Sequence, residues 1–293
     1  MLFPLLVLLA ITNILRAAPI TFNTALAVGK GEYVLREQLV VNQSGQDPSA
    51  LDRDRSETAL VTALGYGLSS KWAVFAALPY RYIDLDLEIN EQPVGQHSSG
   101  IGDLSLFARY TAYQWDAAAQ TMRIAPFVGI KAPTGEYKAH DNLGRLPPPA
   151  QLGTGSWDPF TGVVLTYQTL QYQFDSQLSY RINNKAEGFE AGDIARLDGS
   201  LQYRLYPRIL SGGTPGFLYG VLEMNLIHQD KNEVGGVEDD NSGGTRLFVT
   251  PGIQYVTRRW ILETAIQLPV KQNLNGQALE NDYILRAGFR INF

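Results

Sequence analysis

The stretch that decides the fold is Tyr283-Ile284-Leu285-Arg286-Ala287-Gly288-Phe289-Arg290-Ile291-Asn292-Phe293. Read with the two-residue period of a β-strand, one face carries Tyr283, Leu285, Ala287, Phe289, Ile291 and Phe293, and the other carries Ile284, Arg286, Gly288, Arg290 and Asn292. A soluble sheet rarely ends on an unprotected strand whose last residue is an exposed aromatic. An apolar face opposite a charged face predicts instead a strand of a barrel that spans a membrane.

The same strand carries a pattern associated with barrel assembly. Arg286, Gly288, Ile291 and Phe293 follow the order polar, any, Gly, any, any, apolar, any, aromatic. This order resembles the C-terminal assembly signal of bacterial outer-membrane barrels. The resemblance implies that the barrel-assembly machinery binds the final strand.

The other end of the sequence has the features of an export signal. Residues 2–11 are almost all apolar, and this stretch is too short to cross a hydrocarbon layer of about 30 Å as a helix. We therefore expect residues 1–17 to be a signal peptide that is cleaved after Ala17. Cleavage after Ala27 is an alternative, and an uncleaved anchor helix is another. Residues 18–30 are then expected either to plug the barrel or to hang in the periplasm.

The composition excludes several other classes of protein. Beyond the export signal no stretch approaches about 18 consecutive apolar residues, and the mean hydropathy of -0.12 is too polar for a helical membrane protein. The absence of cysteine removes disulfides and thiolate chemistry from consideration. A net charge of -5 without a basic run argues against a nucleic-acid partner.

Segments with strand alternation recur along the chain. We expect twelve strands, at residues 32–43, 57–68, 72–84, 103–114, 121–133, 160–168, 171–183, 194–206, 216–228, 245–256, 260–270 and 282–293. The short connections 69–71, 169–170 and 257–259 are expected to face the periplasm. The long connections 42–56, 87–102, 137–158, 229–244 and 271–281 are expected to face the outside of the cell. Pro126 and Pro251 fall within predicted strands, where a residue without an amide hydrogen indicates a bulge or a shifted strand boundary.

The charged faces of these strands distinguish a membrane barrel from a soluble β-sandwich. In segment 103–114, the apolar Leu104 and Leu106 alternate with Asp103, Ser105 and Arg109. An Arg or Lys on the lipid-facing side at mid-bilayer costs about 2 to 4 kcal/mol, so these charged residues are expected to share a wet lumen. A sandwich that buries the apolar faces against each other is the alternative.

Several glycine-containing motifs point to a known family. In order, they are Pro19-Ile20-Thr21, Val28-Gly29-Lys30-Gly31-Glu32, Gly100-Ile101-Gly102-Asp103-Leu104, Lys131-Ala132-Pro133-Thr134-Gly135 and Leu152-Gly153-Thr154-Gly155-Ser156-Trp157-Asp158-Pro159. Together they resemble the outer-membrane barrel family named for the MetA pathway of phenol degradation. The resemblance spans nearly the whole chain after the export signal. It implies a bacterial outer-membrane barrel and a passage for small compounds, aromatic ones included, and it implies no catalytic residues.

The charged residues assigned to the lumen by parity are mainly basic. They are Arg36, Arg81, Asp103, Arg109, Arg123, Lys131, Asp175, Arg181, Arg196, Asp198, Arg204, Glu223, Arg246, Glu263, Arg286 and Arg290. A wall of fixed arginines favours anions or carboxylate-bearing solutes if the lumen conducts. Alternatively, the arginines pair with acids across a narrow barrel and close it.

A hydrolase is the third hypothesis. His97 precedes Ser98, but adjacent residues of an extended strand point to opposite sides, and no nucleophile-elbow motif surrounds them. No His, Asp and Glu set has the spacing of a zinc site, and the acidic residues 238–240 are expected to be solvated rather than to bind calcium. We predict no catalytic residue, no cofactor and no metal.

The sequence thus predicts an all-β fold, a transmembrane antiparallel up-and-down β-barrel of about 12 strands over residues 31–293, in the bacterial outer membrane. The predicted function is a passive channel or transporter for small solutes, aromatic or anionic ones included. A closed-lumen structural or surface-interaction barrel is the alternative. The predicted partners are outer-membrane lipid, the barrel-assembly machinery and a small-molecule solute.

Overall fold

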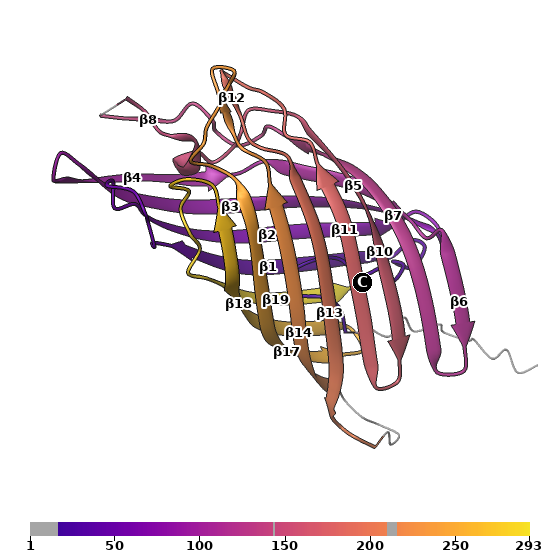
Figure 1. Ribbon diagram of the computed structural model, residues 1–293. Helices are drawn as coiled ribbons and strands as arrows, with labels where there is room; N and C mark the ends of the chain where they lie inside the picture. Colours follow the sequence, from indigo (N-terminus) through magenta and orange to yellow (C-terminus); the bar gives the residue numbers. More distant parts are fainter. Residues whose placement is uncertain (1–16, 143, 210–215) are drawn as a thin grey trace, which may run out of the picture.

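Strands that run in alternating directions lie side by side around a closed ring in the computed structural model (Figure 1). The structure describes residues 17–142, 144–209 and 216–293. The twelve strands of the ring are β1 (Tyr33–Ser44), β2 (Asp54–Gly67), β3 (Trp72–Ile89), β5 (Leu104–Tyr110), β7 (Gln120–Ala132), β10 (Asp158–Thr169), β11 (Tyr172–Arg181), β13 (Ile194–Tyr206), β14 (Gly216–Gln229), β17 (Gly244–Thr257), β18 (Trp260–Leu274) and β19 (Tyr283–Asn292). Every pairing between them is antiparallel, and β1 pairs with β19 to close the ring. The predicted up-and-down barrel is confirmed, whereas the predicted signal peptide lies outside the described residues except for Ala17.

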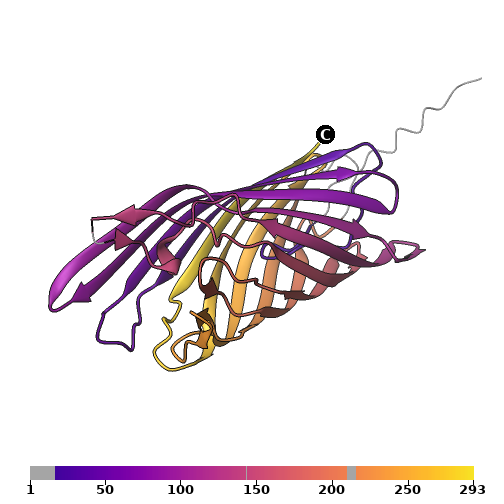
Figure 2. The ribbon, with the colours of Figure 1, turned by 90° about the horizontal axis from the view of Figure 1, so that it is seen from above.

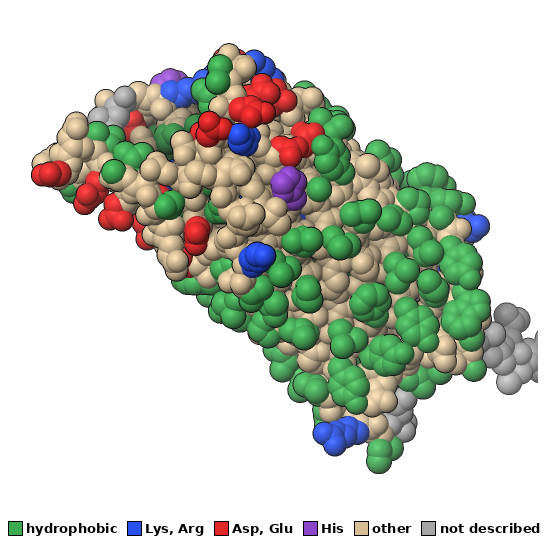
Figure 3. Space-filling model, viewed as in Figure 1, with side chains coloured by type: hydrophobic (Ala, Val, Ile, Leu, Met, Phe, Trp, Pro, Cys, Tyr) green, Lys and Arg blue, Asp and Glu red, His purple; other side chains and the backbone are tan. Residues whose placement is uncertain are grey.

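The alternation of side chains explains why the sheet closes around a polar interior. Outward-facing Leu197, Leu201 and Leu205 of β13 are exposed, whereas Asp198 and Gln202 between them are buried. Figure 3 shows hydrophobic side chains spread over the barrel wall and acidic ones gathered beyond one end of it. This end carries the long connections, and we call it the loop end. The opposite end, with the short connections and Phe293, is the turn end.

One long connection is not a loop. The predicted strand 72–84 is longer in the structure, because β3 continues to Ile89 and forms a hairpin with β4 (Gln92–Ile101) within the predicted connection 87–102. Asn90 and Glu91 both have a positive φ, 52° and 61°, as the two-residue turn of a tight hairpin requires. The hairpin extends well beyond the barrel rim (Figures 1 and 2). The predicted end of the strand was too early because backbone pairing outside the membrane needs no apolar face.

The backbone pairing of β7 is irregular beside one of the two prolines that the sequence places within strands, Pro126. The segment predicted as one strand, 103–114, is divided into β5 and β6 (Tyr113–Ala117), and both pair with β7. Arg109 lies opposite Phe127 and Tyr113 lies opposite Ile124, so one extra residue is accommodated beside Pro126. This is the expected bulge. Where β17 pairs with β18, the register shifts between Leu247 and Phe248 and not at Pro251, and Val270 of β18 is the extra residue.

Short elements cover the loop end. They are β8 (His140–Asp141), β9 (Gly144–Arg145), the 3-10 helix η1 (Pro148–Ala150), β12 (Phe189–Glu190), β15 (Glu233–Val234) and β16 (Val237–Glu238). The last three form a separate three-stranded sheet. Among the described residues, no helix is long and apolar enough to cross a membrane.

Candidate functional site

The inner face of the barrel is a network of buried polar side chains. Gln202, Glu223, Asn225 and Gln254 are fully buried on inward positions of β13, β14 and β17. Asn225 Oδ1 accepts a hydrogen bond from Gln267 Nε2 at 3.1 Å. Buried polar groups are normally hydrogen-bonded, and here most of the partners come from neighbouring strands. The wall is therefore a rigid surface of donors and acceptors.

The N-terminal segment, residues 17–30, enters this lumen and bonds first to β14 and β17. The side-chain amide of Gln254 forms two hydrogen bonds with the backbone of Ala18. Its Oε1 accepts from Ala18 N at 3.2 Å, and its Nε2 donates to Ala18 O at 2.6 Å. Glu223 accepts from Ile20 N at 2.7 Å and from Thr21 N at 3.0 Å. Ile20 is fully buried. These contacts hold the beginning of the segment inside the barrel.

A second set of contacts holds the next residues of the segment against β5 and β10. Thr166 Oγ1 accepts from Ala25 N at 2.8 Å and lies 3.0 Å from Thr24 Oγ1. Arg109 donates to the carbonyl oxygens of Thr24 and of Leu26, the latter at 2.7 Å. The Arg109 guanidinium therefore serves as a clamp on the backbone of the segment.

The segment leaves the lumen at the turn end. Gly31 N donates to Gly67 O at 2.8 Å, and Lys30 forms an isolated parallel bridge with Gly67. A Cβ atom at position 67 would lie 2.0 Å from Gly29 O, so only glycine permits this approach. The sequence left open whether residues 18–30 plug the barrel or hang free, and the structure places residues 17–26 within it.

Many of the residues predicted to line the lumen form ion pairs. Arg36 pairs with Glu263, and Lys131 bridges Asp103 at 3.2 Å and Asp158. The other pairs join Arg196 to Asp198 at 3.0 Å, Arg81 to Glu57 at 2.7 Å and Arg123 to Asp116 at 2.8 Å. The negative charges of these acids offset much of the positive charge that the basic side chains bring to the lumen. Glu57, Asp116 and Asp158 were absent from the predicted set, although parity alone could have included Glu57 and Asp158.

The remaining predicted residues have other environments. Asp175 accepts from Thr166 Oγ1 and from Gln173 Nε2, and the Arg204 guanidinium lies 5.8 Å from the centre of the Phe217 ring. Arg286 donates to the amide oxygens of Gln38 and Gln267, and the half-buried Arg290 lies within electrostatic range of Arg36 and Glu263. Four arginines keep a buried Nε that bonds to none of the described residues: Arg181, Arg196, Arg204 and Arg246.

An aromatic cluster lies in the lumen against the N-terminal segment. The rings of Phe75 and Phe107 stack with centroids 4.7 Å apart, and Phe107 meets Phe127 and Phe160 edge-on at 6.0 and 6.1 Å. Phe127 packs with Ala25 of the segment in one hydrophobic cluster. A Cβ at Gly129 would lie 2.4 Å from the Phe160 ring, so the rings rest directly on the backbone of β7. The cluster forms an apolar patch on the loop-end side of the segment.

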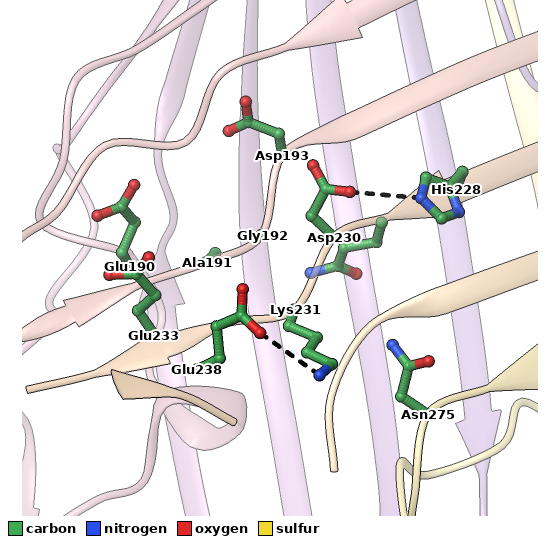
Figure 4. Close-up of a pocket in the computed structure, with 11 residues that line it drawn as sticks. Glu190, Ala191, Gly192, Asp193, His228, Asp230, Lys231, Glu233, Glu238 and Asn275 are labelled. Atoms are coloured by element: carbon green, nitrogen blue, oxygen red, sulfur yellow. Dashed lines mark hydrogen bonds and ion pairs between the residues drawn. The ribbon is translucent and has the colours of Figure 1, made fainter. Parts of the chain in front are cut away.

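A polar cavity of about 420 Å³ opens among the outer connections (Figure 4). His228 in its lining lies 3.3 Å from Asp230, and Lys231 pairs with Glu238 at 3.4 Å and with Asp240 at 2.5 Å. The pKa of the Lys231 ammonium is raised chiefly by its hydrogen bond to Asp240. Within the described part of the chain, no group of three or more potential ligands could hold a metal ion.

The residues weighed for a hydrolase are not assembled into a catalytic pair. Ser98 Oγ donates to Ala150 O at 2.6 Å. His97 occupies the opposite face of β4, where it is exposed beside Asp84 of β3. Adjacent strand residues point apart, as the sequence indicated.

Comparisons with known proteins agree with this architecture. The chain superimposes on a crystal structure of an outer membrane channel from Pseudomonas putida F1 with a TM-score of 0.71 at 14% sequence identity, covering 95% of this chain and 100% of that one. A second solved structure, the β domain of the Bordetella autotransporter Brka, gives a TM-score of 0.48 at 14% identity over 90% and 100% of the two chains. None of the curated proteins compared with this sequence matches it.

Residues 51–275 match the family named for the MetA pathway of phenol degradation. The match includes the motifs 100–104, 131–135 and 152–159 and covers ten of the twelve strands of the ring from β2 to β18. The resemblance drawn from the sequence is confirmed, and the chain belongs to the family named for the MetA pathway of phenol degradation.

Proposed function

We propose that the protein is a passive channel of the bacterial outer membrane for small solutes, and that the N-terminal segment, residues 17–30, is its plug. The single observation that carries the proposal is the nature of the plug's contacts. The segment is held mainly by hydrogen bonds between its backbone and the side chains of Arg109, Glu223 and Gln254. Water can replace such bonds, because a typical hydrogen bond contributes about 1 kcal/mol net and one to a charged group about 1.5 to 3 kcal/mol.

The exposed apolar belt supports the membrane location. Leu178, Leu201 and Leu222 are exposed on neighbouring strands at 57%, 45% and 52%. A continuous apolar surface of this kind needs hydrocarbon around it. We place the turn end in the periplasm and the acidic loop end outside the cell.

The solutes are small, and aromatic compounds fit the lumen better than simple inorganic anions. The ion pairs of Arg36, Arg81 and Lys131 reduce the field that a bare arginine wall would create. The phenylalanine cluster beside the plug offers an apolar contact that an inorganic ion cannot use.

A disulfide tether tests the movement of the plug. The Oγ1 atoms of Thr24 and Thr166 lie 3.0 Å apart, and the chain has no native cysteine. The double variant Thr24→Cys, Thr166→Cys should close the channel to aromatic solutes in proteoliposomes when oxidised, and reduction should restore uptake.

A matched control places the disulfide within the wall. Gln168 and Gln173 bond across β10 and β11, so the pair Gln168→Cys, Gln173→Cys forms a crosslink that does not involve the plug. Its oxidation should leave uptake unchanged. Equal uptake by the oxidised and reduced plug tether would contradict a movable plug, and absence of uptake in both states would favour a closed-lumen structural barrel.

A further inference from the structure

Two arginines and an aromatic ring share one patch of the inner wall on the loop-end side of the plug. Phe160 of β10 lies directly opposite Arg181 of β11 in the register. Arg196 of β13 lies opposite Ser179, two residues from Arg181 on the same face. Directly opposed Cβ atoms are about 5 Å apart, and diagonal neighbours are about 7 to 8 Å apart. The ring of Phe160 and the two guanidinium groups are therefore within reach of one small molecule.

The hydrogen-bonding capacity of both arginines is only partly used. Among residues 17–142, 144–209 and 216–293, the Nε atoms of Arg181 and Arg196 are buried and bond to no protein atom. Arg196 reaches Asp198 through Nη2 at 3.0 Å, and its side chain remains 31% exposed. A buried donor without an acceptor is costly, and a planar guanidinium fork matches a carboxylate. The patch therefore offers donors to an anion that enters from the loop end.

The aspartates around Arg181 already have partners of their own. Asp158 pairs with Lys131 and accepts from Asn184 N at 2.9 Å. Asp193 accepts from Tyr180 Oη at 2.7 Å and from Asn183 N at 2.9 Å. Both carboxylates lie within electrostatic range of Arg181, but no ion pair within 4.0 Å joins either of them to it in the described structure.

The apolar half of the patch is continuous with the aromatic cluster. Phe160 contacts Phe107 with centroids 6.1 Å apart and Phe127 with centroids 6.3 Å apart. A benzene ring on this surface gains edge-to-face contacts worth about 0.5 to 1.5 kcal/mol beyond its area burial. An anionic group placed on the arginines would direct such a ring toward Phe160.

We infer that Arg181, Arg196 and Phe160 form a binding site for an aromatic monocarboxylate in the outer part of the lumen. The inference rests on the proposed function because it names a substrate class for the channel. Binding is measured without transport, so failure of this inference leaves the tether experiment to be judged separately.

The test is equilibrium binding of benzoate to the full folded chain in detergent micelles, by calorimetry against empty micelles. Benzamide has the ring without the charge, and acetate has the charge without the ring. Wild-type protein should bind benzoate at least about tenfold more tightly than either analogue, because charged hydrogen bonds and ring contacts act together.

Substitutions separate the two halves of the site. Arg181→Gln should weaken benzoate binding about tenfold without affecting benzamide, and Arg181→Lys should give an intermediate affinity because it keeps the charge and loses the fork. Phe160→Leu should weaken benzoate and leave acetate unchanged. Arg246→Gln is the matched control, because Arg246 is also luminal with an unpaired Nε but lies three strands from Arg181.

Two results would overturn the inference. One is equal affinity of the wild-type protein for benzoate and benzamide, which would remove the role of the arginines. The other is equal weakening by Arg181→Gln and Arg246→Gln, which would indicate general attraction to a basic lumen instead of a site. Heat-dependent migration of each variant on a gel confirms that the barrel has folded.

Discussion

At the residue scale, Glu223 joins the wall to the plug. Its carboxylate accepts from Ile20 N, from Thr21 N and Oγ1, and from Ser200 Oγ of the wall. Glu223→Gln would present an amide NH₂ to several of these donors, so the plug should be held less firmly. A single cysteine at buried Phe22 should then react with a water-soluble thiol reagent several-fold faster than in the protein that keeps Glu223.

The control for this residue is Glu57→Gln. Glu57 is also a luminal carboxylate, but its partners are Arg55 and Arg81. Labelling at position 22 should be unaffected by this change. If Glu57→Gln accelerated labelling as much as Glu223→Gln, the rate would reflect general loosening of the barrel and not release of the plug.

At the element scale, β19 both closes the barrel and carries the proposed assembly signal. Tyr33 N donates to Phe293 O at 2.8 Å, Phe293 N donates to Tyr33 O at 3.1 Å, and the two rings stack at 5.6 Å. Phe293→Ala should lower the amount of folded barrel in the outer-membrane fraction severalfold, whereas Phe293→Trp should preserve it. Tyr33→Ala removes the same ring contact but keeps the terminal aromatic residue, so a loss equal to that of Phe293→Ala would favour closure over recognition.

At the scale of the whole molecule, the apolar belt fixes the barrel in the bilayer. Leu201 is exposed at the middle of β13, between exposed Phe174 and Leu222 on the neighbouring strands. Leu201→Arg should lower the free energy of unfolding in lipid vesicles by about 2 to 4 kcal/mol, because the charge would face hydrocarbon. Leu170→Arg, in a turn at the interface, should cost about 1 kcal/mol or less. Equal costs in denaturant titrations would contradict a membrane-embedded belt.

Features that depend on the alternation of residues within a strand could be predicted from the sequence. Contacts between residues that are far apart in the chain could not. Strand alternation was predictable because residue parity fixes side-chain direction, and on this ground Arg36, Asp175 and Glu223 were assigned to the lumen. The position of residues 17–26 was not readable, since their bonds come from wall residues such as Gln254 and Thr166, which are far away in the chain. Residue parity also does not say which side chains pair across strands. The ion pair between Lys131 and Asp158 could therefore be identified only from the register of β7 and β10.

The seam between β1 and β19 has a consequence for the order of folding. Its register joins residues 34–43 to residues 283–292, so closure requires contacts between strands at opposite extremes of the polypeptide. Such distant pairings are slow to form because a large loss of chain entropy precedes any gain. Residues 17–26 lie inside the finished ring, and the segment joins β1 at the turn end. The segment therefore enters the lumen either before the seam closes or afterwards through the turn end, which is the route that a movable plug also uses.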